Sequence, residues 1–440
     1  MSWREYRNAE PTILFTKDFK AEPYWWEDVQ PPERQWARLP ARADVVVIGS
    51  GYTGLHAALR TARGGRHTVV LDAEQAGWGC STRNGGQIST SIKPDLASLA
   101  ARHGRDRARA ILKEGHEALA WIKDFVETEG IECNYKVPGR FHAAHTPRDY
   151  ERLARAAAER IPGLKVDAYP VTRAEQRREL GTDAYHGGVI YPHHASLHPA
   201  RYHYGLLEGA LRAGVDVVPH CTATGVRRDG DGFSLTTSHG NIAARNVIVA
   251  SNGYTGTVTP WQRRRVIPIG SYIIATEPLA PEVMDRLMPK DRIVSDSRRV
   301  VYYYRPSPDR KRILFGGRVS ARETDPRVSG PRLHADLARL FPELEGIRIS
   351  HSWVGFVAYT FDTLAHIGQH EGIHYAMGYC GSGVSMASYL GMRVGQQVLG
   401  LAEGRTAFDG LPFPSRPFYT GRPWFLGVAV AYYRWRDRVG

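Results

Sequence analysis

The hydrophobic and polar positions near the start of the chain follow the order strand, helix, strand. A continuous β-branched run, "ADVVVIGS" at 43–50, predicts a buried parallel strand. The next residues repeat apolar positions along one helical face, and Gly64 and Gly65 end that pattern. A second apolar run, "HTVVLDAE", then ends at Asp72. This order is typical of an α/β fold with a parallel sheet.

The turn between the first strand and the helix has the spacing Gly49-x-Gly51-x-x-Gly54. Such glycines allow a tight turn, close approach of the backbone to a pyrophosphate and close helix packing, with the helix N-terminus facing the phosphates. Asp72 stands about twenty residues later, where an acid accepts the hydroxyls of an adenosine ribose. The pattern predicts dinucleotide binding. An Asp here disfavours NADP and leaves NAD and FAD open, and a nucleotide-free turn is the alternative.

The order of the later segments favours FAD. A Gly-rich polar loop, "GWGCSTRNGGQIST" at 77–90, follows the second strand, where an NAD domain would continue its sheet. The nucleotide fold resumes only with a helix at 199–213 and a strand at 215–218, followed by a polar hairpin and the buried run "VIVASNGYTG". After a second departure, "GIHYAMGYCGSGVSMASYLGMRVGQQVLG" supplies a strand, a glycine turn and a long helix.

Six motifs in this order carry a resemblance to a known family: "YWWEDVQPP", "ADVVVIGSGYTGL", "GWGCSTRNGGQ", "VIVASNGYTG", "LFGGR" and "GYCGSGVSMA". The chain resembles the flavin-dependent amine and amino-acid oxidoreductases of the D-amino-acid oxidase, glycine oxidase and sarcosine oxidase superfamily over nearly its whole length. The resemblance implies an α/β fold: a Rossmann-like FAD-binding domain (1–90, 197–262 and 351–440) with an inserted α+β antiparallel-sheet substrate domain (91–196 and 263–350).

The resemblance also implies which residues hold the cofactor. Backbone N–H groups at the start of the last helix would stabilise negative charge at N1–C2=O of the reduced flavin. The pyrophosphate would be held by Gly49, Ser50, Gly51 and Gly54, with support from Ala250 and Gly253, and the ribose by Asp72. The isoalloxazine ring would lie beside Ser81, Arg83, Asn84, Gly85 and Gly86, and the adenine beside Thr224 and Val226. The start of the last helix would contribute Gly381, Gly383 and Val384.

Three departures from the family pattern narrow the expected chemistry. Val357 and Ala358 occupy the neighbourhood where sarcosine oxidases attach the flavin to a cysteine, and Cys380 lies in the glycine turn instead, so noncovalent FAD is expected. Leu314 or Phe315 occupies the position of the lysine with which sarcosine oxidases activate oxygen, although a gap in the alignment would place Lys311 there. Both oxidase and dehydrogenase activity therefore remain open. Ser385 replaces the lysine that anchors a substrate carboxylate.

The expected substrate is therefore an extended amine, such as a polyamine, a γ-glutamyl amine, an ω-amino acid or an aminophosphonate. Aromatic faces attract ammonium groups, and an arginine can hold a distal carboxylate or phosphonate; Arg83, Arg305, Arg318 and Arg322 are candidates for that role, with ion pairing as the alternative. In "VVYYYRP" the side chains alternate, so Tyr303 faces away from its neighbours and at least one tyrosine packs within the sheet. The expected substrate residues are Trp78, Tyr272, Tyr302, Tyr304, Arg318 and Tyr359. Catalysis by hydride transfer to flavin N5 needs no dedicated base, and Arg83, Tyr359 and His366 are the side-chain candidates.

Composition excludes other classes. The net charge of +13 is spread along 440 residues, which predicts a solvated surface or steering of acidic small molecules rather than nucleic-acid binding. Four scattered cysteines give no zinc or disulfide pattern and suit a cytoplasmic protein, and no apolar run is long enough to span a bilayer. The expected partners are a small amine, oxygen or another electron acceptor, and a second copy of the chain. The aromatic, basic C-terminal tail either docks a partner or a membrane surface, or packs over the FAD domain.

Overall fold

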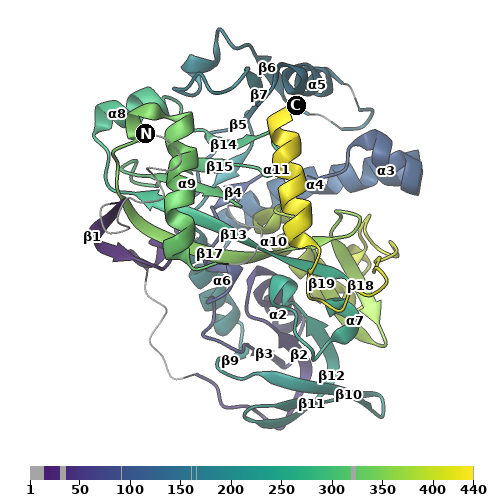
Figure 1. The fold of residues 1–440 in the computed structure, drawn as a ribbon. Helices are drawn as coiled ribbons and strands as arrows, with labels where there is room; N and C mark the ends of the chain where they lie inside the picture. Colours follow the sequence, from purple (N-terminus) through teal and green to yellow (C-terminus); the bar gives the residue numbers. More distant parts are fainter. Residues whose placement is uncertain are drawn as a thin grey trace.

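The computed structural model describes residues 14–29, 36–90, 92–159, 161–164, 166–318 and 324–439. Two large sheets dominate the described residues, one of eight strands and one of nine. They occupy the lower and upper halves of Figure 1, with helices packed around and between them. The α/β class predicted from the sequence is confirmed.

The eight-stranded sheet has a parallel centre. β2 (Arg42–Ile48) lies between β3 (Thr68–Leu71) and β12 (Gly240–Val249), and Val45, Val46 and Val47 are fully buried. A strand covered on both faces needs a continuous apolar run, and this is why "VVVI" reads without alternation. The other strands of this sheet are β9 (Asp216–Val218), β10 (Ala223–Asp229), β11 (Gly232–Thr237), β18 (His366–His370) and β19 (Ile373–Met377).

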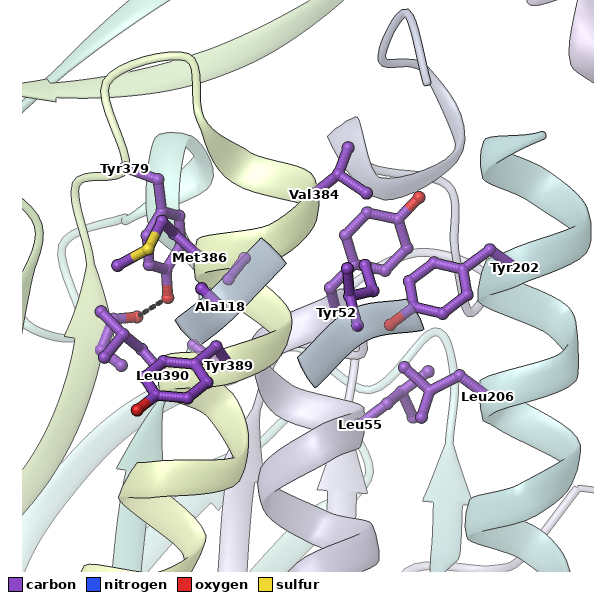
Figure 2. Packing of buried hydrophobic residues seen from close by; sticks show 14 of the residues in the cluster. Tyr52, Leu55, Ala118, Tyr202, Leu206, Tyr379, Val384, Met386, Tyr389 and Leu390 are labelled. Atoms are coloured by element: carbon purple, nitrogen blue, oxygen red, sulfur yellow. Dashed lines mark hydrogen bonds between the residues drawn. The ribbon is translucent and has the colours of Figure 1, made fainter. Parts of the chain in front are cut away.

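Two helices on this sheet pack unusually closely. α2 (Tyr52–Arg63) lies against α10 (Gly383–Val398), although they come from opposite ends of the chain. A Cβ at Gly391 would lie 2.6 Å from the Thr53 carbonyl oxygen, so only glycine allows this approach. Figure 2 shows part of the apolar cluster beside this contact. The Thr53 and Tyr379 hydroxyls are hydrogen-bonded to each other at 2.6 Å.

The nine-stranded sheet is mixed. β13 (Val266–Thr276) pairs antiparallel with β17 (Ile349–Thr360) and with β16 (Ile313–Gly317), while β1 (Phe15–Lys20) joins β17 in parallel. Its order is β1-β17-β13-β16-β15-β14-β5-β7-β6. The remaining strands are β5 (Arg140–Ala143), β6 (Tyr169–Val171), β7 (Gly188–Tyr191), β14 (Ile293–Asp296) and β15 (Tyr303–Pro306).

The two faces of this sheet bury side chains in different cores. Ile273, Leu314 and Trp353 point into the core shared with α2 and α10. Tyr272 and Phe315 point into the other core, which contains residues of α8 (Pro281–Leu287) and α9 (Pro326–Leu340). The sheet therefore separates a nucleotide-side face from a far face.

Three elements, two strands and the C-terminal helix, lie at the nine-stranded sheet although the sequence suggested the FAD domain. β1 and β17 belong to the nine-stranded sheet although the sequence analysis placed both in the FAD domain; the division itself stays a prediction. α11 (Leu426–Val439) lies over the strand ends of the same sheet, with Arg434 donating to the Arg318 carbonyl and Asp437 accepting from Arg299 N. The tail thus contacts the nine-stranded sheet rather than only the nucleotide unit.

The other elements connect these layers. A two-stranded ribbon, β4 with β8, links the loop after β3 to the segment before α6. The bounds are: η1 (Tyr24–Trp26), η2 (Cys80–Thr82), β4 (Gln87–Ile88), α3 (Leu96–His103), α4 (Arg105–Thr128), α5 (Pro147–Ala158), η3 (Gln176–Arg178), β8 (Ala195–Ser196), α6 (Pro199–Arg212), η4 (Asn252–Tyr254), α7 (Pro260–Arg263), η5 (Pro342–Leu344) and η6 (Ala402–Gly404). Within the described ranges, no helix is long and apolar enough to cross a membrane, and no cluster of three metal-binding side chains occurs.

One buried carboxyl of α4 gives a prediction about stability. Glu114 Oε1 accepts a hydrogen bond from Ala407 N at 2.7 Å, and burial raises the pKa of Glu114 from its ordinary 4.5 to about 7. Ionisation of this group therefore destabilises the fold, and its cost grows as pH rises from 4.5 to about 7. The shift corresponds to on the order of 3 kcal/mol at pH 8.

We expect E114Q to be more stable than the wild type at pH 8 and nearly equal to it at pH 5. Thermal unfolding of both proteins across this pH range measures the difference. E127Q is the matched control, because Glu127 is exposed on the same helix. An E114Q advantage that does not increase with pH would contradict the prediction.

Candidate functional site

The glycine turn after β2 leads directly into α2. Gly49 has φ +108°, and a Cβ at Gly54 would lie 1.8 Å from the Gly49 carbonyl oxygen. Gly51 is the N-cap residue and supplies no side-chain cap. Tyr52 N donates to Ser81 Oγ at 3.0 Å, and Ser50, Tyr52 and Thr53 are buried, so the positive helix end is enclosed by the protein.

Asp72 lies directly beside this turn. Its Oδ2 accepts from Ser50 N at 2.8 Å and from Ser50 Oγ at 2.5 Å. The Asp72 carbonyl accepts from Cys221 N, which brings the start of β10 to the same place. The structure therefore brings together the turn and the acid that the sequence pattern paired.

A buried histidine that the sequence analysis missed supports the turn. His203 of α6 is fully buried, and its Nε2 lies 2.7 Å from the Ser50 carbonyl oxygen. Burial lowers the pKa of His203 to about 4, so the ring is neutral and Nε2 donates. No local pattern reveals this contact, because His203 is far from Ser50 in the sequence.

The loop at 77–87 is held by the N-terminal tryptophans and by its own asparagine. Trp25 Nε1 donates to the Asn84 carbonyl at 2.8 Å, and Trp26 Nε1 donates to Thr82 Oγ1 at 3.0 Å. The Asn84 side chain donates to the Ser81 carbonyl at 3.0 Å and accepts from Gly86 N at 2.8 Å. The side chain of Asn84 thus fixes the loop.

Arg83 is stacked between two indole rings. Its guanidinium carbon lies 4.7 Å from the ring centroids of both Trp26 and Trp78, and Nε donates to the Trp78 carbonyl at 2.7 Å. Trp78 is 40% exposed and contacts Tyr254 edge-on. This stack engages Arg83, which was expected beside the flavin, and Trp78, which was expected beside the substrate.

The residues expected beside the adenine, and those expected to support the pyrophosphate, lie on or next to the eight-stranded sheet. Thr224 and Val226 are on β10, where Thr224 Oγ1 donates to the Thr236 carbonyl at 3.2 Å. Ala250 N donates to the Ile48 carbonyl at the end of β2. A Cβ at Gly253 would lie 2.7 Å from the Phe356 carbonyl oxygen, so this glycine lets the nucleotide sheet meet β17.

The second glycine turn opens α10 next to the first. Gly381 has φ +94°, and Cys380 before it is buried with its N donating to the Ala358 carbonyl at 3.0 Å. A Cβ at Gly383 would meet nothing within 4 Å, so the first turn of α10 faces open space. Val384 is buried near Tyr52, as Figure 2 shows. Gly391 of α10 lies against Thr53 and Gly395 against Ala57, so the two helices run parallel and both begin at the same end of the pair. The start of α10 extends beyond that of α2 by about two turns, or about 12 Å.

Side chains from the nine-stranded sheet complete this region. The Tyr303 hydroxyl is hydrogen-bonded to Ser271 Oγ at 2.8 Å, and its ring lies 3.2 Å from the position of a Cβ at Gly85. Gly316, opposite Tyr303 in the register, has no side chain and so leaves room for that ring. The Tyr359 hydroxyl lies 3.8 Å from the position of a Cβ at Gly381.

Buried Arg305 joins this sheet to the loop. Its Nη1 donates to the carbonyls of Gly86, at 3.2 Å, and of Leu197, at 2.9 Å, and its Nε donates to the Pro306 carbonyl. Burial lowers the pKa of Arg305 to about 10. Arg318 lies at the end of β16, with Nη1 donating to the Gly270 carbonyl at 2.7 Å. Arg322 falls outside the described residues.

Several expected site residues are not brought to this region. Tyr272 and Tyr304 are fully buried in the core on the far face of the sheet, and Tyr302 packs beside them against Phe315. His366 is also buried; its Nε2 lies 3.1 Å from Asp362 Oδ1, and its ring stacks on Phe413. Strand alternation had already separated Tyr303 from its neighbours, but it did not show which face lies toward the nucleotide.

Replacing Arg83 with Lys tests the stack. R83K keeps the charge but loses the planar group between Trp26 and Trp78. We therefore expect the free energy of unfolding to fall by about 1–2 kcal/mol and the tryptophan fluorescence to shift to the red. Chemical unfolding and emission spectra measure the two effects. R109K is the control, since Arg109 is exposed on α4 beside Asp106. Unchanged stability and emission in R83K would show that the stack has no energetic role.

Comparisons with known proteins agree with this geometry. The family model described as FAD dependent oxidoreductase (DAO) matches residues 44–397. The chain is 32% identical over 429 residues to a probable oxidoreductase, OrdL, of Rhizobium meliloti, covering 94% of this chain and 97% of that protein. It is 31% identical over 406 residues to γ-glutamylputrescine oxidoreductase of Escherichia coli, covering 90% and 93%. Among solved structures, glycine oxidase from Geobacillus kaustophilus superposes with a TM-score of 0.70 at 20% identity, covering 86% of this chain and 99% of that chain.

Proposed function

This chain belongs to the DAO family of FAD-dependent oxidoreductases, and from that membership we propose that it oxidises a primary or secondary amine of an extended substrate. The observation that carries the proposal is the convergence of four elements: the starts of α2 and α10, the loop at 77–87, and the Tyr303 edge of the nine-stranded sheet. The similarity to γ-glutamylputrescine oxidoreductase supports an amine as the substrate.

The residues present fit FAD. Gly49 and Gly54 let the backbone turn tightly at the start of α2, and the open space before Gly383 leaves the first N–H groups of α10 accessible. The pyrophosphate would be held at Gly49–Gly54 and the ribose at Asp72, with the Gly381–Gly383 turn near the flavin pyrimidine. When bound, FAD accepts a hydride equivalent from the C–H next to the amine nitrogen, and water hydrolyses the imine to an aldehyde or keto product.

The protein's contribution is positioning and exclusion of water. Burial raises the pKa of Tyr303, so its phenol stays neutral and keeps the hydrogen bond to Ser271. The tyrosine ring and the Tyr359 hydroxyl supply an aromatic wall with two polar groups, which suits an amine held by orientation rather than by a strong base.

We propose that FAD is bound without a covalent link. Val357 and Ala358 offer no nucleophile, and Cys380 Sγ donates to the Gly378 carbonyl at 3.2 Å. Burial raises the pKa of the Cys380 thiol to about 11, so it stays protonated and unreactive. A protein band that fluoresces yellow on a denaturing gel would contradict this.

The two missing lysines favour an extended substrate. Ser385 Oγ donates to the Ser89 carbonyl at 3.1 Å, so it is engaged within the protein. Leu314, rather than Phe315, lies on the nucleotide-side face, and Lys311 is exposed in the turn before β16. A simple N-methyl α-amino acid therefore finds no cation at either family position, and polyamines, γ-glutamyl amines, ω-amino acids and aminophosphonates are the proposed classes.

A second candidate function is that of a flavin-binding subunit with no amine turnover of its own. The exposed side chains of Trp424, Val428 and Trp435, which are 56–77% exposed, lie on and just before α11 and favour a partner there. Anaerobic bleaching separates the two candidates, because a subunit without turnover is not reduced by any amine.

We expect the flavin absorption of the purified protein to bleach anaerobically with at least one extended amine, and not with N-methylglycine. The panel contains a polyamine, a γ-glutamyl amine, an ω-amino acid and an aminophosphonate. Reoxidation by air or only by an artificial acceptor then distinguishes oxidase from dehydrogenase. If no amine bleaches the flavin, the proposed function is wrong.

Gly383 allows a test of the cofactor site. Because a Cβ at this position meets nothing within 4 Å, we expect apo G383A to unfold like the wild type but to bind FAD at least tenfold more weakly. Quenching of FAD fluorescence measures the affinity. G346A is the control, since a Cβ at Gly346 also meets nothing and this loop lies beyond η5. Wild-type FAD affinity in G383A would overturn the assignment of this turn.

A further inference from the structure

An ammonium group reaches the second glycine turn from the segment between β4 and α3. Lys93 Nζ lies 4.0 Å from the position that a Cβ at Gly381 would occupy, and the Tyr359 hydroxyl lies 3.8 Å from the same position. Lys93 stands between β4 and α3, whereas Tyr359 belongs to β17. Three elements distant in sequence thus bring a cation and a phenol to one turn.

The segment that carries Lys93 is attached to the start of α10. Ser385 Oγ donates to the Ser89 carbonyl, four residues before Lys93. Ser385 occupies the position where sarcosine oxidases have their carboxylate-anchoring lysine. A cation therefore lies on the segment bonded to Ser385 and not at Ser385 itself.

The neighbouring groups on the nine-stranded sheet are also basic or neutral. Arg140 Nε donates to Ser295 Oγ at 2.8 Å, and His142 Nδ1 lies 2.9 Å from the same oxygen. Burial and the positive charges of Arg140 and Lys93 hold the pKa of His142 well below its usual range. Burial and the positive charge of Arg140 lower the pKa of His194, whose Nε2 lies 3.1 Å from Thr90 Oγ1, to about 2, so this ring is neutral as well.

Burial and the negative charge of Asp362 raise the pKa of Cys380 in this turn, and the Asp362 carboxylate is already engaged. Its Oδ1 lies 3.1 Å from His366 Nε2. A substrate end with positive charge would be repelled by the Lys93 ammonium. An end with negative charge would be attracted by it and would form a charge-assisted hydrogen bond with it.

We propose that Lys93 is a substrate-positioning residue that holds an anionic group, a carboxylate or phosphonate, on the amine that this protein oxidises. The proposal rests on the proposed amine oxidation and narrows it: γ-glutamyl amines, ω-amino acids and aminophosphonates remain, and unmodified polyamines are excluded. The Tyr359 hydroxyl is the second donor for the same group.

A binding experiment tests Lys93 without turnover. Benzoate, a carboxylate that cannot be oxidised as an amine, is titrated into the FAD-loaded protein while the flavin absorption bands are followed. We expect K93M to weaken benzoate binding by about 10- to 100-fold and K93R to recover most of the affinity. K113M is the control, because Lys113 is exposed on α4 and pairs with Glu117. Absence of benzoate binding to the wild type, or equal binding to K93M, overturns the proposal.

Anaerobic flavin reduction with matched substrate pairs gives the second readout. 4-Aminobutanoate is compared with butylamine, and 6-aminohexanoate with hexylamine. We expect K93M to raise the half-saturating concentration for the acids only, and the wild type to reduce poorly with putrescine. An equal loss for acids and alkylamines, or a loss confined to reoxidation by oxygen, overturns the assignment. If benzoate binding depends on Lys93 while no amine reduces the flavin, the anion site stands and the proposed function fails.

Discussion

The contact between α2 and α10 places two positive helix ends in one space, and the candidate site is arranged around it. Gly391 and Gly395 let α10 lie against the backbone of α2, since a Cβ at either position would overlap Thr53 or Ala57. Each helix begins at a glycine turn without a side-chain cap. Two parallel macrodipoles favour negative charge at each of the two helix starts. A dinucleotide with a pyrophosphate at one end and an electron-accepting ring at the other matches both helix starts.

The nine-stranded sheet supplies what the helices cannot, namely side chains that distinguish one substrate from another. Tyr303 and Tyr359 lie on strands β15 and β17, and Arg305 attaches the same sheet to the loop at 77–87 through two carbonyl oxygens. The buried guanidinium of Arg305 thus joins the strand that carries Tyr303 to the end of the loop that follows β3.

The sequence predicted the parts of the site that depend on local conformation. Gly49, Gly54 and Asp72 are separated by a single strand–helix–strand unit, so their spacing was enough to place them together. The strand alternation at 302–304 was also correct, but a period of two does not tell which face lies toward the cofactor. Tyr272 and Tyr304 therefore were assigned to the substrate although they lie in the far core. Lys93 and His203 had no local signal at all, because their contacts with Gly381 and Ser50 join segments more than a hundred residues apart.

The parallel pairing of β1 with β17 has a consequence for synthesis of the chain. Phe15 of β1 pairs with Ile349 of β17. β1 is therefore without its partner strand until residues near 350 have left the ribosome. At about 5–20 residues per second, the nascent N-terminal segment waits for on the order of 20–70 s with its strand uncovered. The nucleotide sheet has the same dependence, because β19 joins β12 only later still. This chain is thus expected to rely on chaperones during translation, and its yield in cells is expected to depend on how fast it is elongated.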